Sequence, residues 1–304
     1  MKFFAAAILW LAAFCAAGLV LAVHFARYLH GHAPALGLAA GGAVFLLSAV
    51  LGWLPGLRKK RAARWGLAQA FWLVAGFIIM QLAGMLGCTL LINAATWLAE
   101  KKLHLEVPEM GGAVLVTVVA GYLASALWSF WYIGRLGPAR MRDGSVTGIA
   151  WRRSTSWGYF VAVLLAVLII AAVVVIVHLV PPNMAAIKNM PSAKLFGAPG
   201  WPTLVLAVLA VIIAPPVEEY VFRGGVFAAL ASRCSPLWAG IITTAVFMAV
   251  HAPEKIYYPA GFIDVGLMAA AAAWLRVRFG SIRPGILLHL LYNFGLMFAA
   301  GTLG

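Results

Sequence analysis

The feature that most limits how this chain can fold is a series of nine apolar stretches, most of them long enough to cross a lipid bilayer. A transmembrane helix needs about 20 consecutive apolar residues, and a transmembrane β-strand only about 10. Hydrophobic residues make up 64% of the chain and charged residues 10%, against roughly 45–50% and 25% in soluble domains. We therefore predict an all-α, polytopic transmembrane bundle of about 8–9 helices. The nine stretches are residues 3–24, 34–55, 66–92, 111–133, 157–180, 201–231, 236–252, 261–279 and 284–301.

The basic residues are distributed unevenly between the two ends of these stretches. If the N-terminus lies in the cytoplasm, 16 of the 22 Lys and Arg residues fall in cytoplasmic segments. Lys and Arg are enriched in cytoplasmic loops, so the N-terminus is predicted to be inside and the C-terminus outside. This pattern explains the net charge of +14 through contact with membrane lipid, and no nucleic-acid partner is expected. The predicted location is a bacterial inner (cytoplasmic) membrane.

The N-terminal half offers little chemistry. The first stretch also resembles a secretory signal, but its apolar run is longer than a usual signal core and favours an uncleaved helix. The first four stretches are rich in Gly and Ala, whose small side chains permit close helix contact. Residues 1–156 are therefore predicted to be N-terminal transmembrane helices of unknown role.

The segment from Ala214 to Gly224, APPVEEYVFRG, places charges inside an apolar stretch. A charged side chain at the bilayer centre costs about 2.5–3.5 kcal/mol on insertion scales, so charges there indicate a functional site. Glu219 and Arg223 are four residues apart and are predicted to pair on one helix face. Glu218 then lies about 100° away around the helix, where it is free to act as a base.

The next apolar stretch adds Phe247 and His251, one turn apart on a common face. Glu218 lies 17 residues before Ser235, the centre of the connecting turn, and His251 lies 16 residues after it. At 1.5 Å per residue both would be roughly 25 Å from that turn. An antiparallel pair of helices would therefore bring Glu218 and His251 to the same depth.

The last apolar stretch carries His289 and Asn293, again four residues apart. Counted from a turn near Arg283, they would lie about 9–15 Å deep, which is shallower than Glu218. The mismatch disappears if the turn at Ser235 protrudes by two helical turns. A His and an Asn presented together are suitable hydrogen-bond donors to a developing oxyanion.

These three motifs together resemble the CPBP (Abi) family of intramembrane proteases, which includes the type II CAAX prenyl endopeptidases. The motifs are Glu218-Glu219-x-x-x-Arg223, Phe247-x-x-x-His251 and His289-x-x-x-Asn293, in that order. The resemblance covers about residues 201–304, and with the preceding stretch it implies a protease core over residues 157–304. It implies that Glu218, assisted by His251, activates a water molecule for attack on a peptide carbonyl. Glu219, Arg223 and Phe247 would support the site, and His289 and Asn293 would stabilise the oxyanion.

The implied mechanism could operate with or without a metal ion. Two histidines and a glutamate, here His251, His289 and Glu218, are a ligand set that can bind zinc with one position open for water. The sequence has no His-Glu-x-x-His helix, and the glutamic-protease mechanism of the family needs no metal. We therefore expect a glutamic endopeptidase without a cofactor, with a zinc metalloprotease as the alternative.

Two functions of other classes also fit the composition. A proton-coupled transporter uses intramembrane carboxylates and histidines as a relay, but its usual internal repeat of broken helices has no counterpart in the first half. A catalytically inactive membrane scaffold would keep the architecture without the reaction. The six polar residues of the three motifs favour the protease, whose substrate would be a peptide or a membrane protein.

Overall fold

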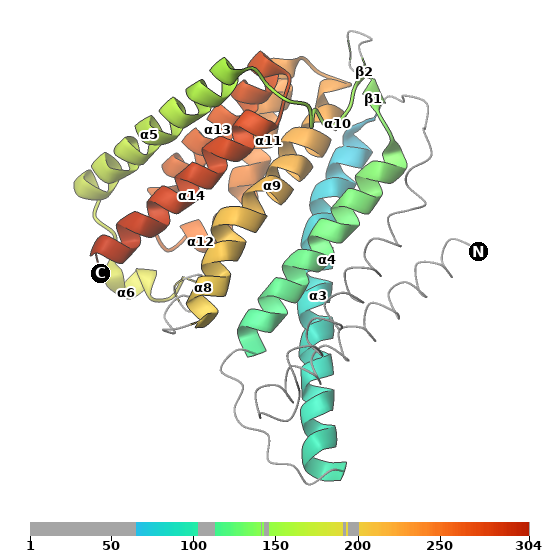
Figure 1. Ribbon diagram of the computed structural model, residues 1–304, viewed down its shortest axis with the longest axis vertical. Coiled ribbons are helices and arrows are strands. Elements are labelled where there is room, and N and C mark those ends of the chain that lie inside the picture. The colour runs from blue at the N-terminus through green and yellow to red at the C-terminus, as the bar shows by residue number, and fades with distance from the viewer. Residues whose placement is uncertain are drawn as a thin grey trace. The chain divides into compact units, whose positions relative to one another are not determined.

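The computed structural model describes residues 65–102, 113–140, 142, 146–190, 193 and 201–303 (Figure 1). The predicted stretches at 3–24 and 34–55 lie outside these residues. The chain divides into two compact units. Of the described residues, one unit contains those between Gly76 and Arg135, and the other contains residues 65–75 and those from Leu136 onward.

The unit that ends at Arg135 contains most of helices α3 (Leu67–Lys102) and α4 (Ala113–Leu136). Both confirm helices expected from apolar stretches, although α3 ends ten residues later than the stretch 66–92. The two helices approach closely at glycines. A Cβ atom added to Gly84 would lie 2.7 Å from Ala124 Cβ and 2.9 Å from Ala120 O. Small residues thus allow backbone contact between α3 and α4.

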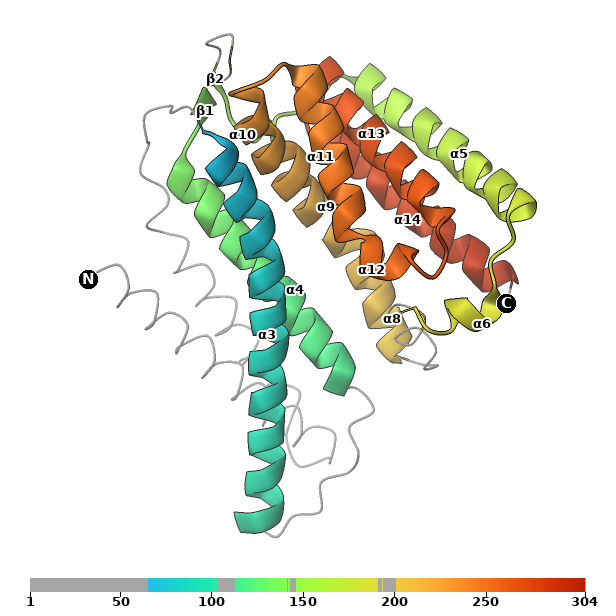
Figure 2. The ribbon, with the colours of Figure 1, turned by 180° about the vertical axis from the view of Figure 1, so that it is seen from behind.

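The other unit contains the remaining helices. Helix α5 (Ser156–Leu179) begins at Thr155, whose side chain accepts a hydrogen bond from the Gly158 amide, as N-cap residues commonly do. It packs most extensively against α14 (Arg283–Leu303), which also contacts α13 (Gly261–Phe279); α13 in turn packs against α11 (Pro236–Val250). Figure 2 shows these helices side by side from behind. A short helix, α6 (Met184–Ile187), follows α5.

The predicted stretch 201–231 is one continuous helical rod with two π-helical segments. It runs through α8 (Trp201–Val208), η2 (Leu209–Ile213), α9 (Ala214–Glu219), η3 (Tyr220–Val226) and α10 (Phe227–Ala231). Pro215 and Pro216 occupy the first turn of α9, directly after η2. Because proline has no N–H group, neither residue can donate a hydrogen bond to the carbonyls of the preceding turn. The two glutamates therefore lie between two π-helical segments, which are often found at functional sites.

The stretch expected at 236–252 ends earlier than predicted. Helix α11 ends at Val250, with His251 as its C-cap, and a separate short helix, α12 (Ala252–Lys255), follows. Pro253 near the start of α12 cannot continue the α11 hydrogen-bond pattern. Helix α13 has the predicted bounds and ends at Gly280, whose φ of 60° is the left-handed conformation that glycine adopts readily.

A small β-hairpin departs from the all-α prediction. Strands β1 (Ala139–Arg140) and β2 (Val146–Thr147) pair antiparallel. The chain that follows lies against the helices: Ile149 occupies the space that a side chain at Gly224 would need, and Ala150 O accepts a hydrogen bond from Ile282 N at 3.1 Å. Ile149 and Ala150 therefore contact both the η3 segment and the start of α14.

Four described helices are long and apolar enough to cross a membrane, by length and composition: Leu67–Lys102, Ala113–Leu136, Ser156–Leu179 and Thr203–Ala231. Pro236–Val250 is a shorter apolar helix. Helices α13 and α14 are not among the four, and they carry polar residues such as Asp264 and His289. The chain is an integral membrane protein made mainly of helices, and the number of 8–9 spans and the inside N-terminus stay predictions.

Candidate active site

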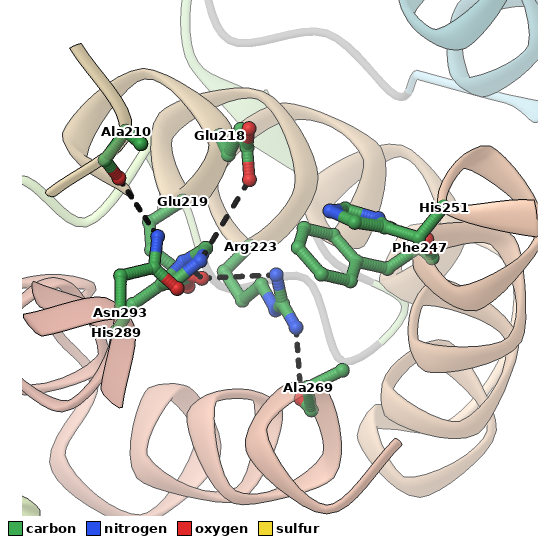
Figure 3. A network of polar contacts seen from close by, with 9 residues as sticks. All are labelled: Ala210, Glu218, Glu219, Arg223, Phe247, His251, Ala269, His289 and Asn293. Atoms are coloured by element: carbon green, nitrogen blue, oxygen red, sulfur yellow. Dashed lines mark hydrogen bonds and ion pairs between the residues drawn. The ribbon is translucent and has the colours of Figure 1, made fainter. Parts of the chain in front are cut away.

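Polar side chains from three separate helices meet around the α9 segment (Figure 3). Glu218, Glu219 and Arg223 come from the rod that contains α9 and η3, Phe247 and His251 from the end of α11, and His289 and Asn293 from α14. The mismatch in depth between Glu218 and His289 that the sequence suggested is absent, because the two side chains approach within 3.8 Å.

Glu219 and Arg223 form the buried centre of this arrangement. Arg223 Nη1 lies 2.9 Å from Glu219 Oε1, and both side chains are fully buried. Arg223 Nη2 donates a second hydrogen bond, of 2.9 Å, to Ala269 O on α13. The predicted i, i+4 ion pair is confirmed, and its guanidinium also links the rod to α13.

His289 lies between the two glutamates. Its Nδ1 is 3.1 Å from Glu219 Oε1, and its Nε2 is 3.8 Å from Glu218 Oε2. Because the Glu219 carboxylate also accepts from Arg223, Nδ1 of His289 must be the donor in this contact. The Nε2–Glu218 separation is too long for a direct hydrogen bond. Glu218 is the more open of the two acids, with a side chain 15% exposed.

Phe247 is the apolar residue against which the polar side chains of the site pack. The guanidinium carbon of Arg223 lies 4.4 Å from the centre of its ring, a distance at which cation–π attraction is effective. The Phe222 ring packs edge-on against it at 5.0 Å and the His289 ring at 5.8 Å. The Phe247 ring therefore packs against both the Arg223 guanidinium and the His289 ring and helps to fix their positions.

His251 caps the end of α11. Its Nδ1 lies 2.8 Å from Phe247 O, and since a carbonyl oxygen only accepts, Nδ1 carries the proton. Its ring lies 4.4 Å from the Phe247 ring, and Figure 3 shows it extending over Phe247 toward α9. Among the described residues, no direct hydrogen bond joins His251 to Glu218, so the two predicted partners share a site without touching.

Asn293 is held by the backbone of the rod. Its Nδ2 donates a hydrogen bond of 2.8 Å to Ala210 O, in the η2 segment before the prolines. One of its two N–H groups is thus committed, and the other is available.

Glu218, His251 and His289 are the residues that would bind zinc in the alternative mechanism. No group of three or more His, Cys, Asp or Glu side chains in the described part of the chain is arranged to hold a metal ion. Nδ1 of His289 is taken by Glu219, and Nδ1 of His251 by Phe247 O. These contacts occupy Nδ1 only, and metal-binding histidines commonly donate one ring N–H in this way while the other nitrogen binds the metal. The absence of a metal therefore stays a prediction, with zinc as the alternative.

Several supporting groups could not be identified from the sequence. The Ala269 and Ala210 carbonyls accept hydrogen bonds from site residues, and a backbone carbonyl carries no sequence signal. Gly285 leaves room for the second oxygen of Glu219, since an added Cβ would lie 3.2 Å from Oε2. The only sequence signal for Gly285 was its place four residues before His289, on the same helix face.

Comparison with known proteins agrees with this assembly of motifs. Residues 199–295 match the family model described as type II CAAX prenyl endopeptidase Rce1-like. No curated protein and no solved structure matches the chain. The matched region contains every residue of the candidate site, and over this region the chain is similar to the Rce1-like family of type II CAAX prenyl endopeptidases.

Proposed function

We propose that this chain is an intramembrane endopeptidase that hydrolyses a peptide bond with water activated by Glu218. The observation that carries the proposal is the placement of Glu218 beside His289 and next to a fully buried Glu219–Arg223 pair. The substrate is a peptide or a segment of a membrane protein that reaches the site within the bilayer.

The two adjacent glutamates have different roles. Glu219 Oε1 takes contacts from Arg223 and His289, so its charge is compensated and it serves as a structural anchor. Among the described residues, Glu218 has no ion pair as close as the one between Glu219 and Arg223, and it is partly exposed. A carboxylate in that position accepts a proton from water, which makes the oxygen nucleophilic at the moment of attack.

His251 assists Glu218 from the end of α11. With Nδ1 protonated and bonded to Phe247 O, the Nε2 nitrogen of a neutral imidazole has a free lone pair. That nitrogen orients the water or receives its proton and passes it to the leaving amine. Contact through a water molecule is compatible with the absence of a direct bond between His251 and Glu218 in the described residues.

His289 and Asn293 stabilise the oxyanion of the tetrahedral intermediate. His289 is fixed by its Nδ1 contact with Glu219, and its Nε2 faces Glu218. When Nε2 carries a proton as well as Nδ1, its N–H is a donor to the oxyanion. Asn293 contributes the amide N–H that Ala210 does not use. Loss of one oxyanion donor typically lowers kcat by about 10²–10³.

A fluorogenic peptide library and the detergent-purified protein test the proposal. We expect cleavage by the wild type, a fall of about 10²–10⁴ in Glu218→Gln, and near wild-type cleavage in Glu254→Gln, a matched substitution on α12. Activity should persist with a chelator. Loss of activity with the chelator and its return with zinc would contradict the metal-free mechanism, and full activity of Glu218→Gln would contradict the role of Glu218.

A further inference from the structure

The hydrogen bond between Asn293 and Ala210 points to a second task for the asparagine. We propose that Asn293 is a positioning residue that replaces a backbone hydrogen bond lost at Pro215 and so fixes the glutamate-bearing rod against α14. Its place in catalysis rests on the proposed function, whereas its effect on helix packing does not.

The backbone around Ala210 explains why an outside donor is needed. In η2 the hydrogen bonds connect residues five apart, as in the bond from Ala214 N to Leu209 O. The next donor in this series, toward Ala210 O, would be residue 215, and Pro215 has no N–H group. In a helix surrounded by lipid, a carbonyl that loses its backbone donor is served by a side chain of a neighbouring helix. Asn293 Nδ2 does this at 2.8 Å.

Asn293 and His289 form two links between the same pair of helices. His289 contacts Glu219, and Asn293, one turn further along α14, contacts Ala210, nine residues before Glu219. The links run in opposite directions along the two chains, as expected for antiparallel helices. A single link permits rotation and sliding, whereas two links fix the register of α14 against the rod.

This register sets the distance between Glu218 and His289. Glu218 Oε2 and His289 Nε2 are 3.8 Å apart without a direct hydrogen bond, so nothing in that contact itself holds the separation. A misplacement of about 1 Å in a catalytic site lowers the rate by about 10²-fold. Asn293 therefore acts on the reaction through the placement of other groups, in addition to any N–H that it offers.

A double-mutant experiment in the full-length protein separates positioning from direct chemistry. The variants are Asn293→Ala, Pro215→Ala and their combination, with Pro216→Ala as the matched control. Pro215→Ala returns an N–H five residues after Ala210, and Pro216→Ala returns one five residues after Val211. Thermal unfolding in detergent and kcat and KM for the best library peptide are measured for each.

We expect Asn293→Ala to lower the melting temperature by about 2–4 °C and kcat by about 100-fold, with little change in KM. Pro215→Ala should restore most of the melting temperature and at least about 10-fold of kcat in the Asn293→Ala background, and Pro216→Ala should restore neither. If Asn293→Ala does not fold, recovery of folded protein by Pro215→Ala is the same test.

Three results would overturn the positioning role. One is a loss of kcat at unchanged melting temperature that Pro215→Ala does not restore, which assigns Asn293 to the oxyanion alone. Another is equal rescue by the two proline variants, and the third is no effect of Asn293→Ala on either measurement. If the wild type hydrolyses no peptide, the proposed function fails, and the melting temperatures still decide whether Asn293 holds the two helices together.

Discussion

The two compact units of this protein use buried polar side chains in opposite ways. In the described part of the unit that ends at Arg135, the buried polar side chains are the hydroxyl groups of Thr117, Ser125 and Ser129, and each donates to a carbonyl of its own helix. In the other unit, buried side chains include Glu219, Arg223, Asp264, Arg276 and His289, and several of them bond to other helices.

This difference shows what holds each unit together. A hydroxyl satisfied within its own helix leaves helix association to close packing, as at Gly84. A buried charge needs a charged or hydrogen-bonded partner, because an unpaired charge in a low-dielectric interior is costly. Arg223 therefore reaches Ala269 O on α13, and His289 on α14 reaches Glu219. The same links that stabilise this unit assemble its reactive groups.

Removal of the buried cation should have the largest effect. Arg223→Met leaves Glu219 as an uncompensated buried charge, and breaking a buried pair in this way costs about 3–5 kcal/mol. We expect a strong fall in melting temperature together with loss of peptide hydrolysis. The double variant Glu219→Gln/Arg223→Met should recover part of the stability without the activity, and a wild-type melting curve for Arg223→Met would show that the pair does not hold this unit together.

Enlargement of a packing glycine should break the contact between α3 and α4. The added methyl group of Gly84→Ala would lie within 3 Å of Ala120 O and of the Gly121 Cα, and such overpacking costs about 1–3 kcal/mol. Gly87→Ala is the control, since nothing lies within 4 Å of its Cβ. Thermal unfolding should detect destabilisation in the first variant and none in the second; similar curves would mean that α3 and α4 do not depend on close approach.

Enlargement of Gly285, which lies beside Glu219 in the candidate site, should have the smallest effect on stability. Gly285→Ala places a Cβ 3.2 Å from Glu219 Oε2 and 3.5 Å from Ala272 Cβ, so Glu219 must shift by a few tenths of an ångström. We expect a loss of about 1 kcal/mol of stability and a clear fall in kcat. Gly240→Ala, whose Cβ meets only Ala273 Cβ at 3.7 Å, should change neither. Equal activity of the two variants would place Glu219 outside the reaction.

Local features of the site were accessible from the sequence. The pairing of Glu219 with Arg223 follows from the periodicity of a helix, and the bounds of α13 follow from its apolar run and its terminal glycine. The end of α11 was predicted two residues too late, because His251 and Ala252 can continue a helix up to Pro253 and nothing in the apolar run marks Val250 as its end. The β-hairpin at Ala139–Thr147 was missed because its strands have two residues each, too few for any pattern.

Contacts between helices were accessible only in part. Equal counting from the Ser235 turn placed Glu218 and His251 at one depth, and the two residues do share the site, but counting cannot show which atoms meet. His289 is the closer neighbour of Glu218, and His251 is bonded to its own helix. Which side chains meet across two helices depends on how each helix is rotated about its axis and tilted. These angles vary continuously, and the sequence carries no periodic pattern that predicts them.

The sequence by itself determined that this protein is a membrane-embedded helical bundle with costly polar groups on three helices, because hydrophobicity and helical spacing are properties of short segments. Only the tertiary structure decided that His289 lies between the two glutamates and that Asn293 donates to the Ala210 carbonyl. Those outcomes depend on distances between helices far apart in the chain. Such distances are set by the packing of all the helices together.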